Sequence, residues 1–184
     1  VGDFYAQESR DVILEVSLAD RQMQVPHLNV VLTYTDTVHK KMEFCDPHPC
    51  YIDRPNGTML SPPNEHVQVQ WLRVCAVNEM TKADQWSREG KLQEARQSIH
   101  QSLSHVQSQR EVQSNALVKQ MVSDLNRLSL GLESSSAFRG HGSMTLSSTL
   151  QSHKMQRCSV SNPSGQNVYQ TSRKSKLSMS FQGP

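Results

Sequence analysis

The fold is decided by residues 67–132, which begin VQVQWLRVCAVNEMTKADQWSREGKLQEARQSIHQSLSHV (67–106). Apolar side chains recur there at intervals of three and four residues, the period of one helical face. The two series are Leu72, Ala76, Met80, Ala83 and Trp86, then Leu92, Ala95, Ile99, Leu103 and Val106. Each stripe has to be buried, so the pattern predicts two helices packed against each other. Arg73 and the other charged residues of the first helix are expected on the remaining surface.

Gly90 lies between the two stripes, where a helix ends easily in a left-handed residue. Arg88 precedes it and suits the negative end of a helix dipole. The connection is therefore short, which predicts an antiparallel hairpin. A third stripe, at Leu117, Met121, Leu125, Leu128 and Leu132, predicts a third helix.

Short strands are predicted before the helices, because apolar and polar residues alternate and turn residues separate the segments. The segments are Asp11–Leu18, Leu28–Thr35, Val38–Phe44, Tyr51–Ile52 and Val67–Trp71. Such strands favour a small antiparallel sheet or half sandwich, one face of which the helical hairpin could cover. The predicted fold class is therefore α+β.

The end of the chain has a different composition. From Ser134 onward it contains six Lys or Arg and no Asp or Glu, and it is rich in Ser, Gly and Gln. From Ser159 to Pro184 this composition cannot offset the entropy of ordering, so that part of the chain is expected to stay disordered. The predicted organisation is an antiparallel β lobe at 1–70, a helical region at 71–157 forming one unit with it, and a disordered basic tail at 158–184.

Composition bounds the class of protein. Of the 184 residues, 35% are hydrophobic and 5% aromatic, and no apolar run reaches the length of about 18 residues that a membrane span needs. Four unevenly placed cysteines do not suggest a disulfide framework, so we expect a reducing, intracellular and cytoplasmic setting. The chain begins with Val1, and nothing near it resembles a signal peptide, which indicates a piece of a longer protein.

Cys45, His48 and Cys50 are the sharpest candidate metal ligands, with two thiols and an imidazole inside six residues. A structural zinc site normally has four ligands in separated pairs. No fourth ligand is adjacent here, so we interpret the segment as a proline-containing turn and predict no metal and no cofactor. A zinc-stabilised binding module is kept as an alternative.

Signatures of catalysis are missing from the sequence. It contains neither a glycine-flanked serine elbow nor a glycine-rich phosphate loop, so we predict that this segment is not an enzyme. Nucleic-acid binding would rest on the basic residues Lys154, Arg157, Arg173, Lys174 and Lys176. Few aromatic residues accompany them, and tails of this kind are more often linkers or phosphorylation substrates, so we expect no nucleic-acid partner.

Two patches of sequence carry a family resemblance. The opening VGDFYAQESRDV (1–12) resembles the segment that leaves a von Willebrand factor A (vWA) domain in plant RING-type ubiquitin ligases and in vWA/Hint proteins. The residues Gly142, Leu150, Ser152-His153 and Gln156-Arg157 match the spacing of a closing pattern of the same family. Between them, Ala83, Gly90, Leu92 and Ala95-Arg96 look like its helical stretch. Residues 1–157 together resemble the Vwaint domain.

The resemblance implies a non-catalytic structural and protein-interaction module that follows a vWA domain. Its partners would be that upstream vWA domain and a further protein, and no family catalytic residue carries over to this chain. An alternative is that the segment positions substrate within a RING-type ubiquitin ligase. We expect Ser152, His153, Gln156 and Arg157 to form a polar clamp that ties the last ordered segment back to the fold, rather than a catalytic site.

Overall fold

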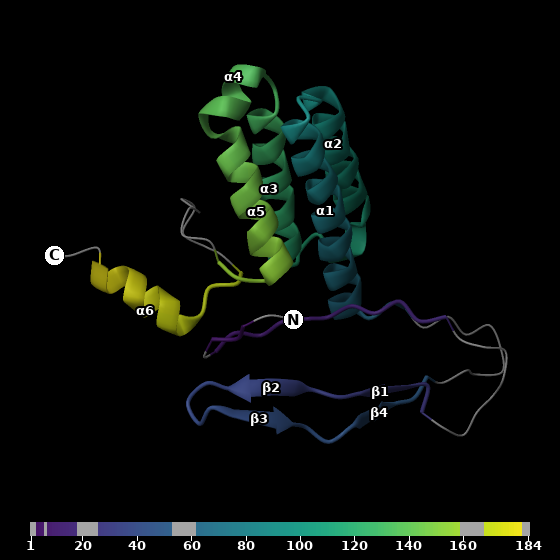
Figure 1. The fold of residues 1–184 in the computed structure, drawn as a ribbon. Helices are drawn as coiled ribbons and strands as arrows, with labels where there is room; N and C mark the ends of the chain where they lie inside the picture. Colours follow the sequence, from purple (N-terminus) through teal and green to yellow (C-terminus); the bar gives the residue numbers. More distant parts are fainter. Residues whose placement is uncertain (1–2, 6, 18–25, 53–61, 159–167, 182–184) are drawn as a thin grey trace. The chain divides into compact units, whose positions relative to one another are not determined.

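The computed structural model describes residues 3–5, 7–17, 26–52, 62–158 and 168–181, and the chain within it divides into two compact units (Figure 1). Residues 1–13 and 63–184 belong to a helical unit, and residues 14–62 to a β unit. The order of elements, antiparallel strands followed by a helical hairpin and further helices, is that of the predicted α+β class. The division at residue 70 inferred from the sequence stays a prediction.

The helical hairpin and the third helix are confirmed. The hairpin consists of α1 (Glu65–Arg88) and α2 (Leu92–Ser108), and α3 (Ala116–Gly131) follows it. Gly90 has a φ of 79°, the left-handed conformation expected of the residue that ends α1. The short 3-10 helix η1 (Arg110–Val112) makes the break before α3. Ile99 and Met121, from the second and third stripes, are fully buried.

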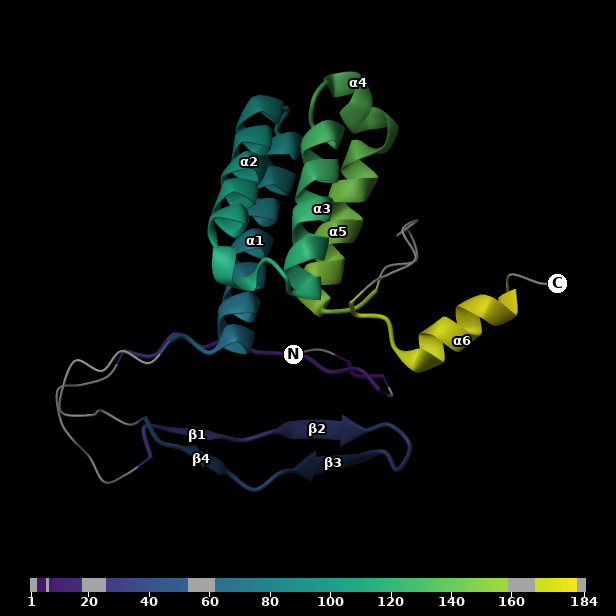
Figure 2. The ribbon, with the colours of Figure 1, turned by 180° about the vertical axis from the view of Figure 1, so that it is seen from behind.

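A further long helix, α5 (Ser143–Met155), completes a bundle in which α1, α2, α3 and α5 stand side by side (Figures 1 and 2). A short turn of helix, α4 (Ser135–Ala137), and a π-helical turn, η2 (Phe138–Gly142), lead into α5. Leu146 and Leu150, one turn apart, face the core formed by the other helices.

Two glycines bring α3 and the start of α5 into backbone contact. A Cβ atom added to Gly142 would lie 2.2 Å from the carbonyl oxygen of Gly131. A side chain at residue 142 therefore cannot fit without separating the two helices.

The β unit is a two-stranded antiparallel ribbon. Strands β1 (Leu28–Val30) and β4 (His48–Cys50) pair with each other, as do β2 (Thr33–Asp36) and β3 (Lys41–Phe44). Val30 pairs with His48, whereas Thr33 pairs with Phe44, so three steps along one strand match four along the other. The extra residue lies at Asp46-Pro47 and makes a β-bulge. Pro47 is tolerated there because a bulged residue needs no ladder hydrogen bond.

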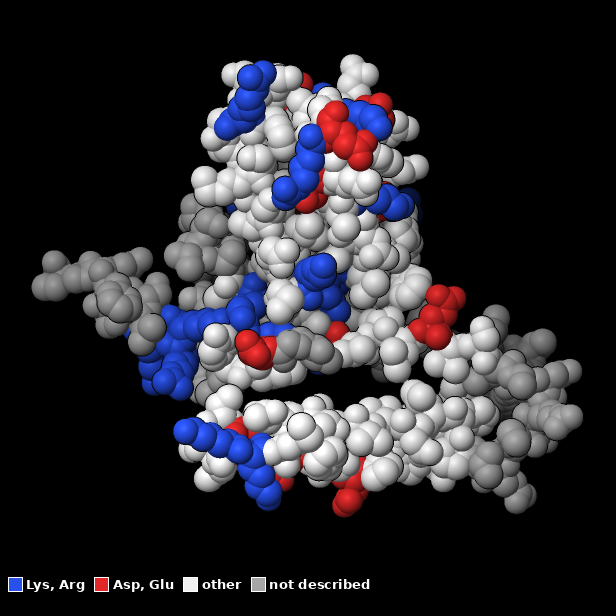
Figure 3. Space-filling model, in the orientation of Figure 1, with Lys and Arg blue, Asp and Glu red and all other residues white. Residues whose placement is uncertain are grey.

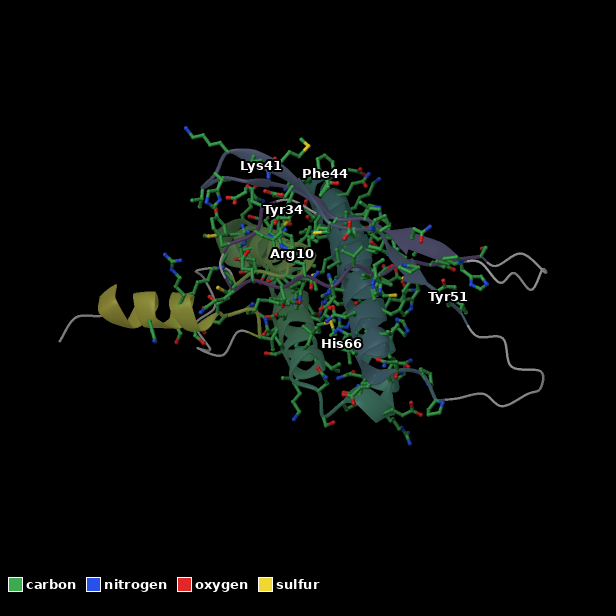
Figure 4. The ribbon with its side chains drawn as sticks, turned by 90° about the horizontal axis from the view of Figure 1, so that it is seen from below. Arg10, Tyr34, Lys41, Phe44, Tyr51 and His66 are labelled. Carbon is green, nitrogen blue, oxygen red and sulfur yellow. The ribbon has the colours of Figure 1, made fainter. Side chains whose placement is uncertain are left out.

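Apolar side chains remain exposed on both faces of this ribbon. Tyr34 is 48% exposed and Phe44 68%, and both are labelled in Figure 4. Alternation places Tyr34 with Val30 and Leu32 on one face, and all three side chains are exposed.

Two predicted strands are wrong. Residues 67–71 form part of α1, because Asn64 caps the helix by accepting a hydrogen bond from the Val67 backbone N–H at 3.2 Å. Residues 11–17 are not paired as a strand in the described part of the chain. Tyr51–Ile52 lies just beyond the observed strand β4.

The predicted disordered tail is only partly described. Residues 159–167 and 182–184 lie outside the described residues. Within the same tail, Ser172–Phe181 form the helix α6, and Tyr169 packs against the bundle core.

Candidate functional site

The polar side chains of the helical unit gather where three distant segments of the chain meet, at the base of the bundle. The segments are residues 7–11, the last turn of α5 with residues 156–157, and residues 168–174. We call this region the terminal junction. Its members are Glu8, Asp11, Arg73, Asp124, Ser152, His153, Gln156, Arg157, Tyr169 and Lys174.

The end of α5 is shaped by Gln156, which adopts the left-handed conformation with φ 49° and ψ 47°. This turn brings the Arg157 backbone N–H to the carbonyl oxygen of Ser152 at 3.0 Å. The Ser152 hydroxyl donates in return to the Arg157 carbonyl at 2.7 Å. The chain therefore leaves α5 in a fixed direction, with Gln156 and Arg157 pointing toward the N-terminal segment.

The side-chain amide of Gln156 pairs with the backbone of Asp11 in the N-terminal segment, as the backbone of a neighbouring strand would. Its Nε2 donates to the carbonyl oxygen of Asp11, and its Oε1 accepts from the Asp11 N–H, both at 2.8 Å. One side-chain amide thus satisfies both backbone groups of a residue 145 positions away in the sequence.

Glu8 holds the other two segments together. Arg157 binds its carboxylate in a bidentate pair, Nε and one Nη each at 2.9 Å, and Lys174 Nζ lies 2.8 Å from Oε1. The Glu8 side chain is only 3% exposed. Burial opposes its ionisation, but the hydrogen bonds from Arg157, Lys174 and the Tyr5 backbone N–H together outweigh burial and lower the pKa of Glu8 to about 2. The carboxylate is therefore charged and tightly held at neutral pH.

Arg73 was expected on the surface of α1, and that prediction is wrong, because the residue is only 4% exposed. Its guanidinium donates to Gln70 Oε1 at 2.6 Å, to the His153 carbonyl at 3.0 Å and to the Asp11 carbonyl at 3.1 Å. Burial lowers the pKa of Arg73. The contact with the His153 carbonyl places the charge at the C-terminal end of α5, where the helix dipole favours a cation.

His153 is fully buried between two partners. Its Nε2 donates to Asp124 Oδ2 at 3.0 Å, since a carboxylate can only accept, and its Nδ1 lies 3.0 Å from the Tyr169 hydroxyl. Burial raises the pKa of Tyr169, so the phenol keeps its proton and donates a hydrogen bond to Nδ1. The Ser152 hydroxyl donates to the Arg157 carbonyl and not to His153, so Ser152 and His153 are not arranged as a nucleophile activated by a general base.

All four residues predicted as a clamp therefore lie in the terminal junction, and each makes a hydrogen bond there. Sequence reasoning missed Glu8, Arg73, Asp124 and Tyr169. Nothing local marks these residues, because their partners lie far away in the sequence. The contribution of the clamp to stability stays a prediction.

Cys45, His48 and Cys50 do not converge on a metal. The register places them on one face of the ribbon, opposite Leu32, Val30 and Leu28. Among the residues that the structure describes, no three His, Cys, Asp or Glu side chains are grouped to hold a metal ion.

A groove between α1 and α2 is lined by Cys75, Glu79, Ser102 and His105. Burial, with the nearby Glu79 charge, raises the pKa of the Cys75 thiol. A thiol whose pKa is raised is a poor nucleophile at neutral pH, so this groove offers no activated cysteine.

Figure 3 shows Lys and Arg side chains collected where α6 begins, next to the bundle base. Of these basic residues, Arg157 and Lys174 are engaged by Glu8, whereas Arg173 and Lys176 are exposed. Within the described ranges, the structure contains no helix with the length and apolar character that a bilayer crossing requires.

Residues 115–179 match the Vwaint family model, described as VWA / Hh protein intein-like. The resemblance inferred from the sequence is thereby confirmed for this region, which includes the closing pattern from Gly142 to Arg157. The match also includes Tyr169 and Lys174, so these tail residues belong to the matched region. The opening segment and the stretch from Ala83 to Arg96 lie outside it. No curated protein and no solved structure matches the chain.

Proposed function

We propose that this chain is a non-catalytic module that follows a vWA domain, and that it acts by packing against that domain and presenting a protein-binding surface. The observation that carries the proposal is the match of residues 115–179 to the Vwaint family model, whose description names VWA proteins.

The terminal junction supports this role. Residues 8–11 are held to the helical unit by Gln156, Arg157 and Lys174 through hydrogen bonds of 2.8–2.9 Å. A domain joined to the N-terminal side of this segment would therefore be followed by residues that are themselves held to the helical unit.

The chemistry of the junction also suits a structural role. Glu8, Arg73 and His153 are buried and engaged in hydrogen bonds. Acids and bases used in this way hold segments together and are not available to a substrate.

The experiment that tests the proposal is determination of the coding sequence upstream of Val1. A vWA domain with an Asp-x-Ser-x-Ser metal motif is the expected result. An initiator Met directly before Val1 would contradict the proposal.

Co-purification then tests the packing. The upstream domain and this chain, expressed as separate polypeptides, are expected to elute together. The surface variant Glu111→Gln should bind the upstream domain as the unmodified chain does. An upstream vWA domain that never binds this chain would refute the packing mechanism.

The same upstream sequence decides whether the parent is a RING-type ubiquitin ligase in which this segment positions substrate. That alternative requires paired Cys and His ligands before the vWA domain. No contact in the described residues favours it over the structural role.

A further inference from the structure

Ser172 is an exposed serine in a strongly basic part of the chain. It is the first residue of α6, and Arg173, Lys174 and Lys176 follow it. Its hydroxyl makes no hydrogen bond to the described parts of the chain. The residue is therefore accessible, and its surroundings suit an enzyme that recognises basic residues beside a serine.

The same residue faces the terminal junction. Ser172 lines one cavity together with Gln7, Glu8 and Gln156. The neighbouring backbone is anchored to this cavity, because the Arg173 N–H donates to Gln7 Oε1 at 3.0 Å and Lys174 Nζ binds Glu8 at 2.8 Å. A group added to the Ser172 hydroxyl would thus enter the surroundings of the Glu8 carboxylate.

We propose that Ser172 is a phosphorylation site for a basic-residue-directed protein kinase, and that its phosphate replaces Glu8 as the partner of Lys174 and Arg157. In the reaction the Ser172 oxygen attacks the γ-phosphorus of ATP, and the bond from that phosphorus to the leaving ADP breaks. The hydroxyl proton passes to the base of the kinase.

The exchange of partners follows from charge. A phosphoserine carries about −1.5 to −2 charges at neutral pH and three strong acceptor oxygens, against one charge and two oxygens on Glu8. In the unmodified junction the Glu8 carboxylate accepts side-chain hydrogen bonds from the cations Arg157 and Lys174, and a backbone hydrogen bond from the Tyr5 N–H at 3.2 Å. Two anions in one cavity repel each other, and the stronger anion draws the two cations away.

Loss of these cations weakens two attachments. Glu8 stays buried and keeps the hydrogen bond from the Tyr5 N–H, but it loses the hydrogen bonds from Arg157 and Lys174, so its pKa rises. The α6 helix loses the Lys174 anchor, and the Arg173 N–H bond to Gln7 opens with it. The phosphate thereby loosens the connection between the N-terminal segment and the tail.

Ser175 provides a matched control on the same helix. It has Lys174 and Lys176 on either side, but it does not line the cavity that contains Glu8. A phosphate at residue 175 adds the same charge to α6 without entering that cavity.

The first arm of the test is enzymatic. The full chain is incubated with ATP and the catalytic domain of protein kinase C, a basic-residue-directed kinase, and the modified residues are located by mass spectrometry. Phosphate at Ser172, absent from the Ser172→Ala variant, is the expected result. Failure of the kinase to modify Ser172 would overturn the assignment of the site.

The second arm is structural. Phosphoserine is incorporated during synthesis at residue 172 or at residue 175, and hydrogen exchange of the Arg173 amide is followed together with an NMR titration of Glu8. Phosphorylation at 172 should speed that exchange at least tenfold and move the Glu8 titration up from about 2, and phosphorylation at 175 should leave both unchanged. Equal behaviour of the two phosphoproteins would refute the exchange of partners.

Discussion

Replacing Glu8 with Gln tests how strongly the terminal junction holds the fold. The substitution keeps the shape of the side chain and removes its charge. The pKa of Glu8 falls from an ordinary 4.5 to about 2 in the folded protein. Each pKa unit corresponds to about 1.4 kcal/mol, so the ionised carboxylate contributes about 3 kcal/mol to the free energy of unfolding. We expect Glu8→Gln to lose about 2–3 kcal/mol at pH 7, because the amide retains part of the hydrogen bonding.

The lowered pKa of Glu8 also predicts the direction in which the stability difference changes with pH. A lowered folded-state pKa means that the stabilisation is complete above the unfolded pKa of 4.5 and disappears as the pH falls toward 2. The difference between wild type and Glu8→Gln, measured by urea denaturation at several pH values, should therefore be largest at neutral pH and shrink below pH 4.5. The exposed Glu111→Gln variant serves as the control, and its stability should change by less than about 0.5 kcal/mol. A Glu8→Gln difference that stays constant between pH 7 and pH 3 would show that Glu8 is not held in the way described.

Three further substitutions test the packing and the turn that ends α5. Gly142→Ala should lower the free energy of unfolding, measured by urea denaturation, by about 2–4 kcal/mol, because the added Cβ meets the Gly131 carbonyl. Gly140→Ala has open space around it and should not destabilise the protein. Equal effects of the two substitutions would contradict the contact between the helices. Gln156→Ala loses both hydrogen bonds to Asp11 and keeps a side chain in the left-handed conformation. Gln156→Gly loses the same bonds but relieves about 1 kcal/mol of left-handed backbone strain, so the alanine variant should unfold at a lower urea concentration. The opposite order would refute this account. Ile99→Asp, which puts an unpaired charge at a fully buried position, should lose several kcal/mol, and a wild-type circular dichroism melt would contradict the hairpin packing.

The helical hairpin could be predicted from sequence because its information is local. The stripe through Ile99 repeats every three or four residues, and Gly90 marks the turn within a few residues of both helices. The same reasoning failed at residues 67–71, where Val67, Val69 and Trp71 alternate as in a strand. Val69 and Leu72 also lie on one helical face, and the cap at Asn64 decides in favour of the helix.

The terminal junction could be predicted only in part, because its contacts are long-range. The pattern around Ser152 to Arg157 marked those residues as important, but nothing near Glu8 indicates that Arg157 will bind it. Arg73 shows the limit most clearly. A charged residue on an amphipathic helix is usually exposed, and its burial follows from the carbonyl groups that α5 and residue 11 supply.

The bulge at Asp46-Pro47 makes this point of the ribbon tolerant of a change in chain length. Removing one of the two residues would leave Val30 opposite His48 and Leu32 opposite Cys45, with every side chain on its present face. A deletion elsewhere in the paired strands would turn all following side chains to the other face. Related chains that differ in length within these paired strands should therefore gain or lose their residue at this position.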